Sequence, residues 1–369
     1  MKTFPLKQMT LERAIQMQFR LVDIIHRNFN GNEVLQAGDY GVVKGIGRPS
    51  FTTKVESVLA EFFEAKGALL VRGAGTGAIR SIFIAALKPG DQIIVHRAPI
   101  YPTTEVTIRS MGLNPVLVDM NDLNEFKKLI NDKIKAILIQ CTRQRMEDSY
   151  EVAEVINVIK ETNRNPIIIA DDNYAAMRVE KIGSQLGADI STFSLFKLLG
   201  PEGIGCVIGG SERSIQVIEK IREDNYSGGC QVQGPEAMDA LRSLVYTPVA
   251  LAIQARVIDE TTERLNAGEV EGVKKAYIAN AQSRVILVEL DEPIAEKVLE
   301  LTWKYGAAPQ PVGAESRYEI SAMFYRVSHT FRQDNPELSK YVIRINPMRS
   351  GPDTIIRILK EAIREVKSS

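Results

Sequence analysis

Two carboxylates and a lysine stand at the ends of apolar segments of this chain. Asp171 and Asp172 directly follow the run Ile167–Ala170, which is typical of a fully buried strand. A second apolar segment, residues 188–196, leads to Lys197 and then to a turn rich in glycine and proline. A carboxylate and an amine at the ends of buried strands are costly unless they pair or are used chemically.

The chemistry that such a pair could perform is that of pyridoxal 5'-phosphate. In such a site a lysine forms a Schiff base, and an acid keeps the pyridine nitrogen protonated so that the ring accepts electrons. Lys197 is the candidate lysine, and either Asp171 or Asp172 is the candidate acid. The alternative is a structural ion pair, or two solvated loop ends.

A glycine-rich turn, Gly73-Ala74-Gly75-Thr76-Gly77, lies between a predicted strand and a predicted helix. Glycines let the backbone approach an anion, and the helix N-terminus offers free N–H groups. The turn therefore predicts a phosphate site. It also fits a dinucleotide loop, with Arg97 as a partner for a 2'-phosphate, and it could be a tight turn that only requires glycine.

Tyr101 and Ser194 could complete a cofactor site. Tyr101 follows the second predicted strand, where an aromatic ring can stack on a flat cofactor. Ser194 precedes Lys197 by three residues and could donate a hydrogen bond to a phosphate. Each of the two could equally be an ordinary core residue.

The elements that must position these residues alternate between strands and helices from residue 68 to residue 210. This alternation predicts a largely parallel, doubly wound sheet, and ligands bind such sheets at the carboxyl ends of the strands. A long helix follows residue 237, interrupted only at Pro248. After this helix the sequence pattern predicts shorter strands that alternate with helices. These strands are predicted at 285–290, 318–323 and 341–347.

We therefore predict an α/β chain in three parts. Residues 1–45 form an N-terminal helix and loop that pack on the C-terminal part. Residues 46–269 form a large α/β domain with a mostly parallel, doubly wound sheet, and residues 270–369 form a smaller α+β domain. A chain of 369 residues is longer than one ordinary hydrophobic core requires, which favours at least two domains.

The composition excludes several classes of function. Basic and acidic residues balance at 46 each, so we expect no nucleic-acid partner. No apolar run reaches membrane length and the N-terminus has no signal-peptide core, so we expect a cytoplasmic protein without a membrane partner. Three scattered cysteines and three histidines predict neither a metal site nor a disulfide framework.

The order of these features resembles that of the fold-type I pyridoxal-phosphate enzymes, the aspartate aminotransferase superfamily. Asp171 and Tyr174 are similar to its Asp-x-x-Tyr segment, whereas Asp172-Asn173 resembles the Asp-Asn of the cystathionine lyase branch. The segment 194–205 is similar to the lysine segments of the methionine γ-lyase-like and selenocysteine synthase-like branches. The whole chain is close to uncharacterised bacterial aminotransferase-like proteins.

This resemblance implies the PLP-dependent transferase fold and a role for each candidate residue. Lys197 would hold the cofactor and act as the base at Cα, and Asp171, or else Asp172, would contact the pyridine nitrogen. The residues expected to bind the cofactor are Gly75, Thr76, Gly77, Tyr101, Asp171, Asp172, Ser194 and Lys197. The usual Ser/Gly-x-Gly phosphate loop is here Ala74-Gly75-Thr76-Gly77, and the Asn-Pro pair of classical aminotransferases is missing.

The substrate carboxylate would require an arginine that binds both of its oxygens. Arg344 matches the place where the superfamily usually has such an arginine. The alternatives are Arg349 and Arg143, and Arg143 belongs to the element Gln140-Cys-Thr-Arg143, which is similar to one of the γ-lyase-like branch. Tyr40 and the loop beginning at Ser227 resemble segments that reach a neighbouring subunit. The resemblance therefore implies a homodimer with shared active sites.

The expected function is an aminotransferase-like reaction of a small amino acid at a Lys197 Schiff base. Expulsion of a β or γ substituent, as in cystathionine or methionine γ-lyases, is the first alternative. An NAD(P)-dependent oxidoreductase built on the Gly73 loop is more distant, because it leaves Asp171, Ser194 and Lys197 without a purpose. A cofactor-free binding protein of the same fold is a further alternative.

Overall fold

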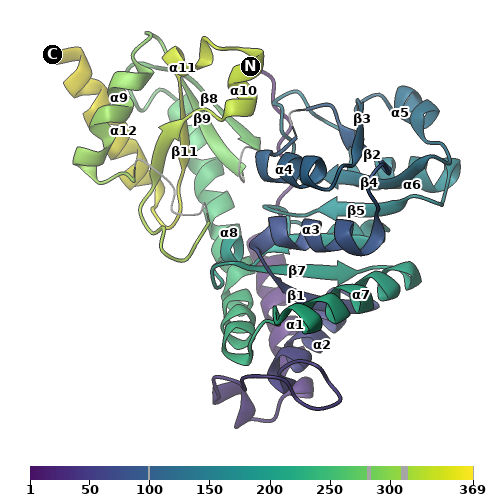
Figure 1. Ribbon diagram of the computed structural model, residues 1–369. Helices are drawn as coiled ribbons and strands as arrows, with labels where there is room; N and C mark the ends of the chain where they lie inside the picture. The colour runs from purple at the N-terminus through teal and green to yellow at the C-terminus, as the bar shows by residue number, and fades with distance from the viewer. Residues whose placement is uncertain (99, 281–283, 309–314, 369) are drawn as a thin grey trace. The chain divides into compact units, whose positions relative to one another are not determined.

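The computed structural model describes residues 1–98, 100–280, 284–308 and 315–368 and divides into two compact units (Figure 1). The large unit comprises Glu12–Cys141 and Tyr150–Val249. The small unit comprises Met1–Leu11, Thr142–Ser149 and Ala250–Ser369. The domain boundaries predicted from the sequence, after residues 45 and 269, differ from those of the two units and stay a prediction.

A seven-stranded sheet forms the centre of the large unit, in the order β1-β7-β6-β5-β4-β2-β3. Its strands are β1 Gly67–Arg72, β2 Gln92–His96, β3 Asn114–Val118, β4 Ile134–Gln140, β5 Ile167–Asp171, β6 Ile190–Ser194 and β7 Ile204–Gly209. The strand β7 is antiparallel to both of its neighbours, β1 and β6, and the pairs among β2 to β6 are all parallel. The predicted, mostly parallel sheet is confirmed.

Helices cover this sheet. Within the large unit they are α1 Leu11–Asn28, α2 Ser50–Phe62, α3 Ala74–Ala86, α4 Pro102–Ser110, α5 Leu123–Leu129, α6 Val152–Thr162, α7 Glu212–Gly228 and the first part of α8 Gly234–Asn266. On one face, Phe83 of α3 and Ile221 of α7 share a core with Ile169 and Val207 of the strands. Pro248 lies inside α8, which continues past it, whereas the sequence predicted an interruption there. Over the described residues, no helix is long and apolar enough to cross a membrane.

The N-terminal helix α1 forms ion pairs with residues of the large unit. Apart from Leu11, α1 belongs to the large unit, where Arg20 pairs with Glu64 at 2.8 Å and Arg27 pairs with Glu61 of α2 at 2.6 Å. Only Met1–Leu11 belong to the small unit, in which the Leu6 amide donates to Asn280 Oδ1. Charged side chains of α1 are thus paired within the large unit, and the prediction that residues 1–45 pack on the C-terminal part stays a prediction.

The small unit is built on a four-stranded antiparallel sheet in the order β10-β11-β9-β8. Its elements are β8 Val273–Asn280, β9 Arg284–Leu290, α9 Ala295–Thr302, β10 Met323–Arg326, α10 His329–Asp334, α11 Leu338–Tyr341, β11 Val342–Asn346 and α12 Pro352–Ser368. Ile286, Ile345 and Leu359 belong to its core. The predicted α+β character is confirmed, but the strand predicted at 318–323 begins only at Met323. Before it, Glu319 accepts a hydrogen bond from the Ser316 amide in a turn.

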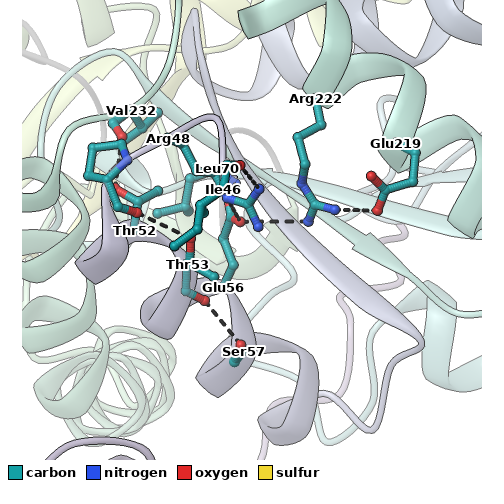
Figure 2. A network of polar contacts seen from close by, with 11 residues as sticks. Ile46, Arg48, Thr52, Thr53, Glu56, Ser57, Leu70, Glu219, Arg222 and Val232 are labelled. Carbon is teal, nitrogen blue, oxygen red and sulfur yellow. Dashed lines mark hydrogen bonds and ion pairs between the residues drawn. The ribbon is translucent and has the colours of Figure 1, made fainter. Parts of the chain in front are cut away.

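A buried ionic cluster holds α2 against the sheet (Figure 2). Glu56 of α2 is 3% exposed, and its Oε1 accepts a hydrogen bond from the Leu70 amide of β1 at 3.1 Å. Its Oε2 lies 2.9 Å from Arg48 Nε and 3.7 Å from Arg222 Nη2. Burial raises the pKa of Glu56, while Arg48, the Leu70 amide and Arg222 lower it. One carboxylate of α2 thus connects a loop, the strand β1 and the helix α7.

We expect Glu56→Ala to lower the free energy of unfolding by about 3–5 kcal/mol, because it leaves the buried Arg48 without its counter-charge and removes one of the two carboxylates that pair with Arg222. Urea denaturation followed by circular dichroism measures this loss. Glu61→Ala is the matched control on the same helix: Glu61 is exposed, and its pair with Arg27 is worth less than about 1 kcal/mol. Equal losses for the two variants would contradict a special contribution of the buried cluster.

Candidate functional site

The carboxyl ends of the central strands bring several of the predicted residues to one edge of the large sheet. Gln140, Asp171 and Thr192 are register partners on β4, β5 and β6, and Ser194 is the last residue of β6. Successive side chains of a strand point to opposite faces. Because Ile169 and Ile190 pack in the core under α3, Asp171 and Ser194 are directed to that same face.

Asp172 lies on the opposite face of the sheet. It is 1% exposed, and its carboxylate accepts the Gly183 amide at 3.1 Å and 3.2 Å and side-chain hydrogen bonds from Ser191 and Cys141. Burial is the largest influence on this group and raises the pKa of Asp172 to about 6. The structure therefore separates the two adjacent carboxylates that the sequence left as alternatives.

Lys197 lies in a short 3-10 helix, η3 Phe196–Leu198, between β6 and β7. Its Nζ is 4.0 Å from the centroid of the Tyr174 ring and 5.6 Å from that of the Tyr101 ring. Burial lowers the pKa of Lys197, while the charges of Tyr101 and Asp171 act in the opposite direction. The Leu198 carbonyl accepts the Thr247 hydroxyl at 2.7 Å, which attaches this segment to α8. The result is a partly buried amine between two aromatic rings.

Asp171 is the carboxylate that faces this amine. It is 8% exposed, and its Oδ1 accepts the backbone amide of Asn173 at 3.1 Å and Asn173 Nδ2 at 2.7 Å. Burial raises the pKa of Asp171, while the Asn173 hydrogen bonds, the Lys197 charge and the Gln140 side chain lower it. These donors and the nearby cation favour the charged form of a carboxyl group that burial disfavours.

The glycine-rich turn opens α3 at the same edge. Gly73 has φ +92° and donates to the Gly203 carbonyl at 2.7 Å. A Cβ at Gly77 would lie 2.0 Å from the Arg72 carbonyl oxygen, so no other residue fits there. Thr76 Oγ1 is 2.8 Å from Thr103 Oγ1 of α4, which places two hydroxyl groups beside the free N–H groups of a helix N-terminus.

The dinucleotide interpretation of this turn does not suit the sheet. The strand before a dinucleotide loop lies at the centre of its sheet, whereas β1 is an edge strand whose neighbour β7 is antiparallel. Arg97, the expected 2'-phosphate partner, instead forms an ion pair with Asp119 at 2.6 Å. Among the described residues, no group of three histidine, cysteine, aspartate or glutamate side chains could hold a metal ion.

The predicted substrate arginines belong to the small unit. Arg344 on β11 is 5% exposed, and its guanidinium carbon lies 3.8 Å from the centroid of the Tyr325 ring on β10. Arg143 is 4% exposed and donates to the Phe4 carbonyl at 3.2 Å. Arg349 donates to the Met348 carbonyl and to Gln254 Oε1. The role of each in substrate binding stays a prediction.

Sequence reasoning missed two residues at this edge. The sequence indicates Asn173 only as part of an Asp-Asn motif, whereas in the structure it contacts both Asp171 and the backbone of Ser194. The second is Thr103, whose position directly after the pair Tyr101-Pro102, at the start of a helix, is the signal that indicates it. Asn173 closely follows the end of β5, and Thr103 lies in the first turn of α4, so each stands near the point where the chain leaves a strand.

The assembled groups suit pyridoxal phosphate. The partly buried amine suits its aldehyde, and the buried carboxylate suits its pyridine nitrogen. The two aromatic rings suit its own ring. The helix start, where only glycine fits and two hydroxyl groups are adjacent, suits its phosphate. Lys197, Asp171, Tyr101 and Thr76 are the residues that would hold these parts.

Comparison with known proteins agrees with this geometry. Residues 45–244 match the family described as Cys/Met metabolism PLP-dependent enzymes, and residues 259–359 match the YhfS-like C-terminal domain. The chain is 50% identical to the uncharacterized protein YhfS of Escherichia coli over 99% of its own length and 100% of that protein. It is 27% identical to an L-methionine gamma-lyase of Pseudomonas deceptionensis, over 40% of this chain and 39% of that enzyme.

Solved structures extend the comparison to the fold. The crystal structure of Escherichia coli YhfS, described as pyridoxal-5'-phosphate dependent, superimposes with a TM-score of 0.95 over 99% of this chain and 100% of that one. A cystathione gamma lyase from Micromonospora echinospora, 15% identical, shares the fold with a TM-score of 0.68 over 87% of this chain and 88% of its own. This chain therefore belongs to the Cys/Met metabolism family of pyridoxal-phosphate-dependent enzymes.

Proposed function

We propose that this enzyme removes the Cα proton of a small amino acid at Lys197 and then expels a substituent from its β or γ carbon. The observation that carries the proposal is the position of Lys197 Nζ between two aromatic rings, with the buried Asp171 charge acting on it. The gamma-lyase names of two similar proteins favour elimination. Transamination, which begins with the same proton transfer, is the second candidate.

Each group at the edge has a definite task in this proposal. Bound pyridoxal phosphate supplies an electron sink for the charge that develops at Cα. Lys197 would hold the cofactor through its amine, and its Nζ would take up the Cα proton of the substrate; its lowered pKa favours the neutral amine that can accept this proton. Asp171 would keep the pyridine nitrogen protonated. Tyr101 would stack on the ring, and Thr76, Gly77 and Ser194 would bind the phosphate.

A homodimer with shared sites is part of the proposal. The two segments that the sequence singled out for it lie side by side within the large unit: the Gly234 amide donates to the Asp39 carbonyl, and the Gly41 amide donates to Gln233 Oε1. Beside them Tyr40 is 76% exposed, and Leu35 is 82% exposed. Exposed apolar side chains on adjacent loops support a subunit contact here. We also propose that the enzyme acts in the cytoplasm.

The attachment of the cofactor can be tested directly. We expect the wild-type chain with pyridoxal phosphate to absorb visible light and to retain the cofactor covalently after borohydride reduction, as measured by mass spectrometry of its peptides. Lys197→Ala should lose both properties, because Lys197 is the amine predicted to attach the cofactor at this edge. Lys220→Ala, which removes an exposed lysine of α7, should behave as the wild type. Reductive labelling of Lys197→Ala at another lysine would contradict the assignment.

The two adjacent aspartates provide a matched pair of variants. Asp171→Asn should weaken cofactor retention and lower the rate of Cα proton exchange by about a hundredfold or more, because a neutral amide cannot hold the pyridine nitrogen protonated. Asp172→Asn should keep the rate of exchange within about tenfold of the wild type, because Asp172 lies on the other face. Deuterium exchange at Cα, followed by NMR, measures both rates. A larger effect at Asp172 would reverse the assignment.

Asp172 should also make stability depend on pH. Its folded pKa of about 6 is raised from 3.8, so its favourable contribution is complete below pH 3.8 and is lost as the pH rises through 6. Asp172→Asn should therefore lose less stability than the wild type between pH 4 and pH 7. Urea denaturation at a series of pH values measures the difference, and parallel curves would contradict the raised pKa.

The branch of the reaction is tested by its products. We expect L-methionine or L-cystathionine to yield ammonia and a keto acid without a keto-acid acceptor, because elimination needs no amino-group acceptor. L-Alanine has no leaving group at its β carbon and serves as the control. Formation of pyruvate from L-alanine only when an acceptor is present, together with no ammonia from the other two, would favour transamination.

A further inference from the structure

Asn173 is the residue at which three parts of the edge meet. Its Nδ2 donates to Asp171 Oδ1 at 2.7 Å, and its Oδ1 accepts the Ser194 amide at 3.0 Å. Its own amide donates to Asp171 Oδ1 as well, at 3.1 Å. A Cβ at Gly75 would lie 2.5 Å from Asn173 Nδ2 and 2.6 Å from its Oδ1. One carboxamide thus contacts the ends of β5 and β6 and the first turn of α3.

The contact with Asp171 has a direct electrostatic effect. A buried carboxylate stays charged only where hydrogen-bond donors or cations replace its lost hydration. The two N–H groups of Asn173 lower the pKa of Asp171 against the effect of burial. The other groups that act on Asp171 are Lys197 and Gln140, which lower its pKa, and Asp172 is the nearby like charge.

We infer that Asn173 is a positioning residue that holds the Asp171 carboxylate in one orientation toward the pyridine nitrogen of the cofactor. The inference rests on the proposed function, in which Asp171 is the partner of that nitrogen. Only a side chain with a donor and an acceptor fits both contacts, because Asp171 needs a donor and the Ser194 amide needs an acceptor. Gly75 follows as a requirement, since a side chain there would displace the carboxamide.

A purely structural role is the alternative: Asn173 would then serve only to tie the end of β5 to the end of β6. Two substitutions separate these roles. Asn173→Asp keeps an acceptor for the Ser194 amide but loses the donor to Asp171 and adds a like charge beside it. Asn173→Ala loses both side-chain hydrogen bonds and adds no charge.

The experiment measures the dissociation constant of the full-length chain for pyridoxal phosphate, together with the pH titration of the visible band of the bound cofactor. We expect Asn173→Ala to weaken binding by about tenfold and Asn173→Asp to weaken it by about a hundredfold, because a hydrogen bond to a charged group accounts for the first loss and like-charge repulsion adds to the second. A structural role alone predicts the reverse order, and that result would overturn the inference.

The pH titration gives a readout that strand attachment alone would not move. In Asn173→Ala the midpoint should move to higher pH, because Asp171 with one donor fewer holds a proton more tightly and leaves the ring nitrogen less charged. Protonation of the neighbouring Lys197 nitrogen is then favoured. A midpoint equal to that of the wild type would overturn the inference. Asn124→Ala and Asn124→Asp, at an exposed position of α5, are the controls and should match the wild type.

A double variant tests the contact with Gly75. Gly75→Ala alone should weaken cofactor binding, because its new methyl group displaces the Asn173 carboxamide. In the Asn173→Ala background the same change should cost at least about tenfold less, because the space is then free. Additive losses would contradict the contact. If Asp171→Asn binds and titrates as the wild type does, the proposed role of Asp171 fails; if only Asn173 proves neutral, this inference fails alone.

Discussion

A buried carboxylate at the end of a central strand is the constraint on which the rest of this site depends. Asp171 lies where the sheet ends, and burial opposes its charge. Its charge can persist only because a lysine, an asparagine and a glutamine are directed to the same face. Those neighbours in turn fix the local backbone: glycine is required at position 75 because the asparagine occupies the adjoining space. The same side chains therefore determine both the charge of Asp171 and the packing around it.

Backbone strain gathers around the same residues. Ala74, Tyr174 and Leu199 have φ values of 56°, 63° and 61°, in the left-handed region that residues other than glycine rarely adopt. Ala74 lies in the glycine-rich turn, Tyr174 lies shortly after Asp171, and Leu199 lies shortly after Lys197. Such conformations persist only where the surrounding structure determines them, and they occur frequently at functional sites. The sheet supplies that rigidity, since β5 and β6 are fully buried.

The sequence was sufficient to predict the large sheet, the small domain and the edge where Asp171 and Lys197 meet, because a β-branched run followed by carboxylates is distinctive. It could not choose between Asp171 and Asp172. The run before them is apolar at every position, so no alternation shows which residue points to which face. The role of Asn173 was not predictable either, since it depends on the backbone of Ser194 across a strand pair. Residues 318–323 alternate as a strand does, yet a local side-chain hydrogen bond of Glu319 favours a turn.

The reversed strand β7 has a consequence for the lysine. Parallel neighbours in such a sheet need a long crossover, but β6 and β7 are antiparallel, with Ser194 paired to Gly205. Residues 195–203 therefore form a closed loop that leaves the sheet and returns to it at the same edge, which also receives the end of β1. The length of this loop is set by the register of two buried strands. The position of Lys197 therefore depends on the number of residues between it and the two strands. Insertions or deletions in this loop would move the lysine, whereas ordinary surface loops tolerate them.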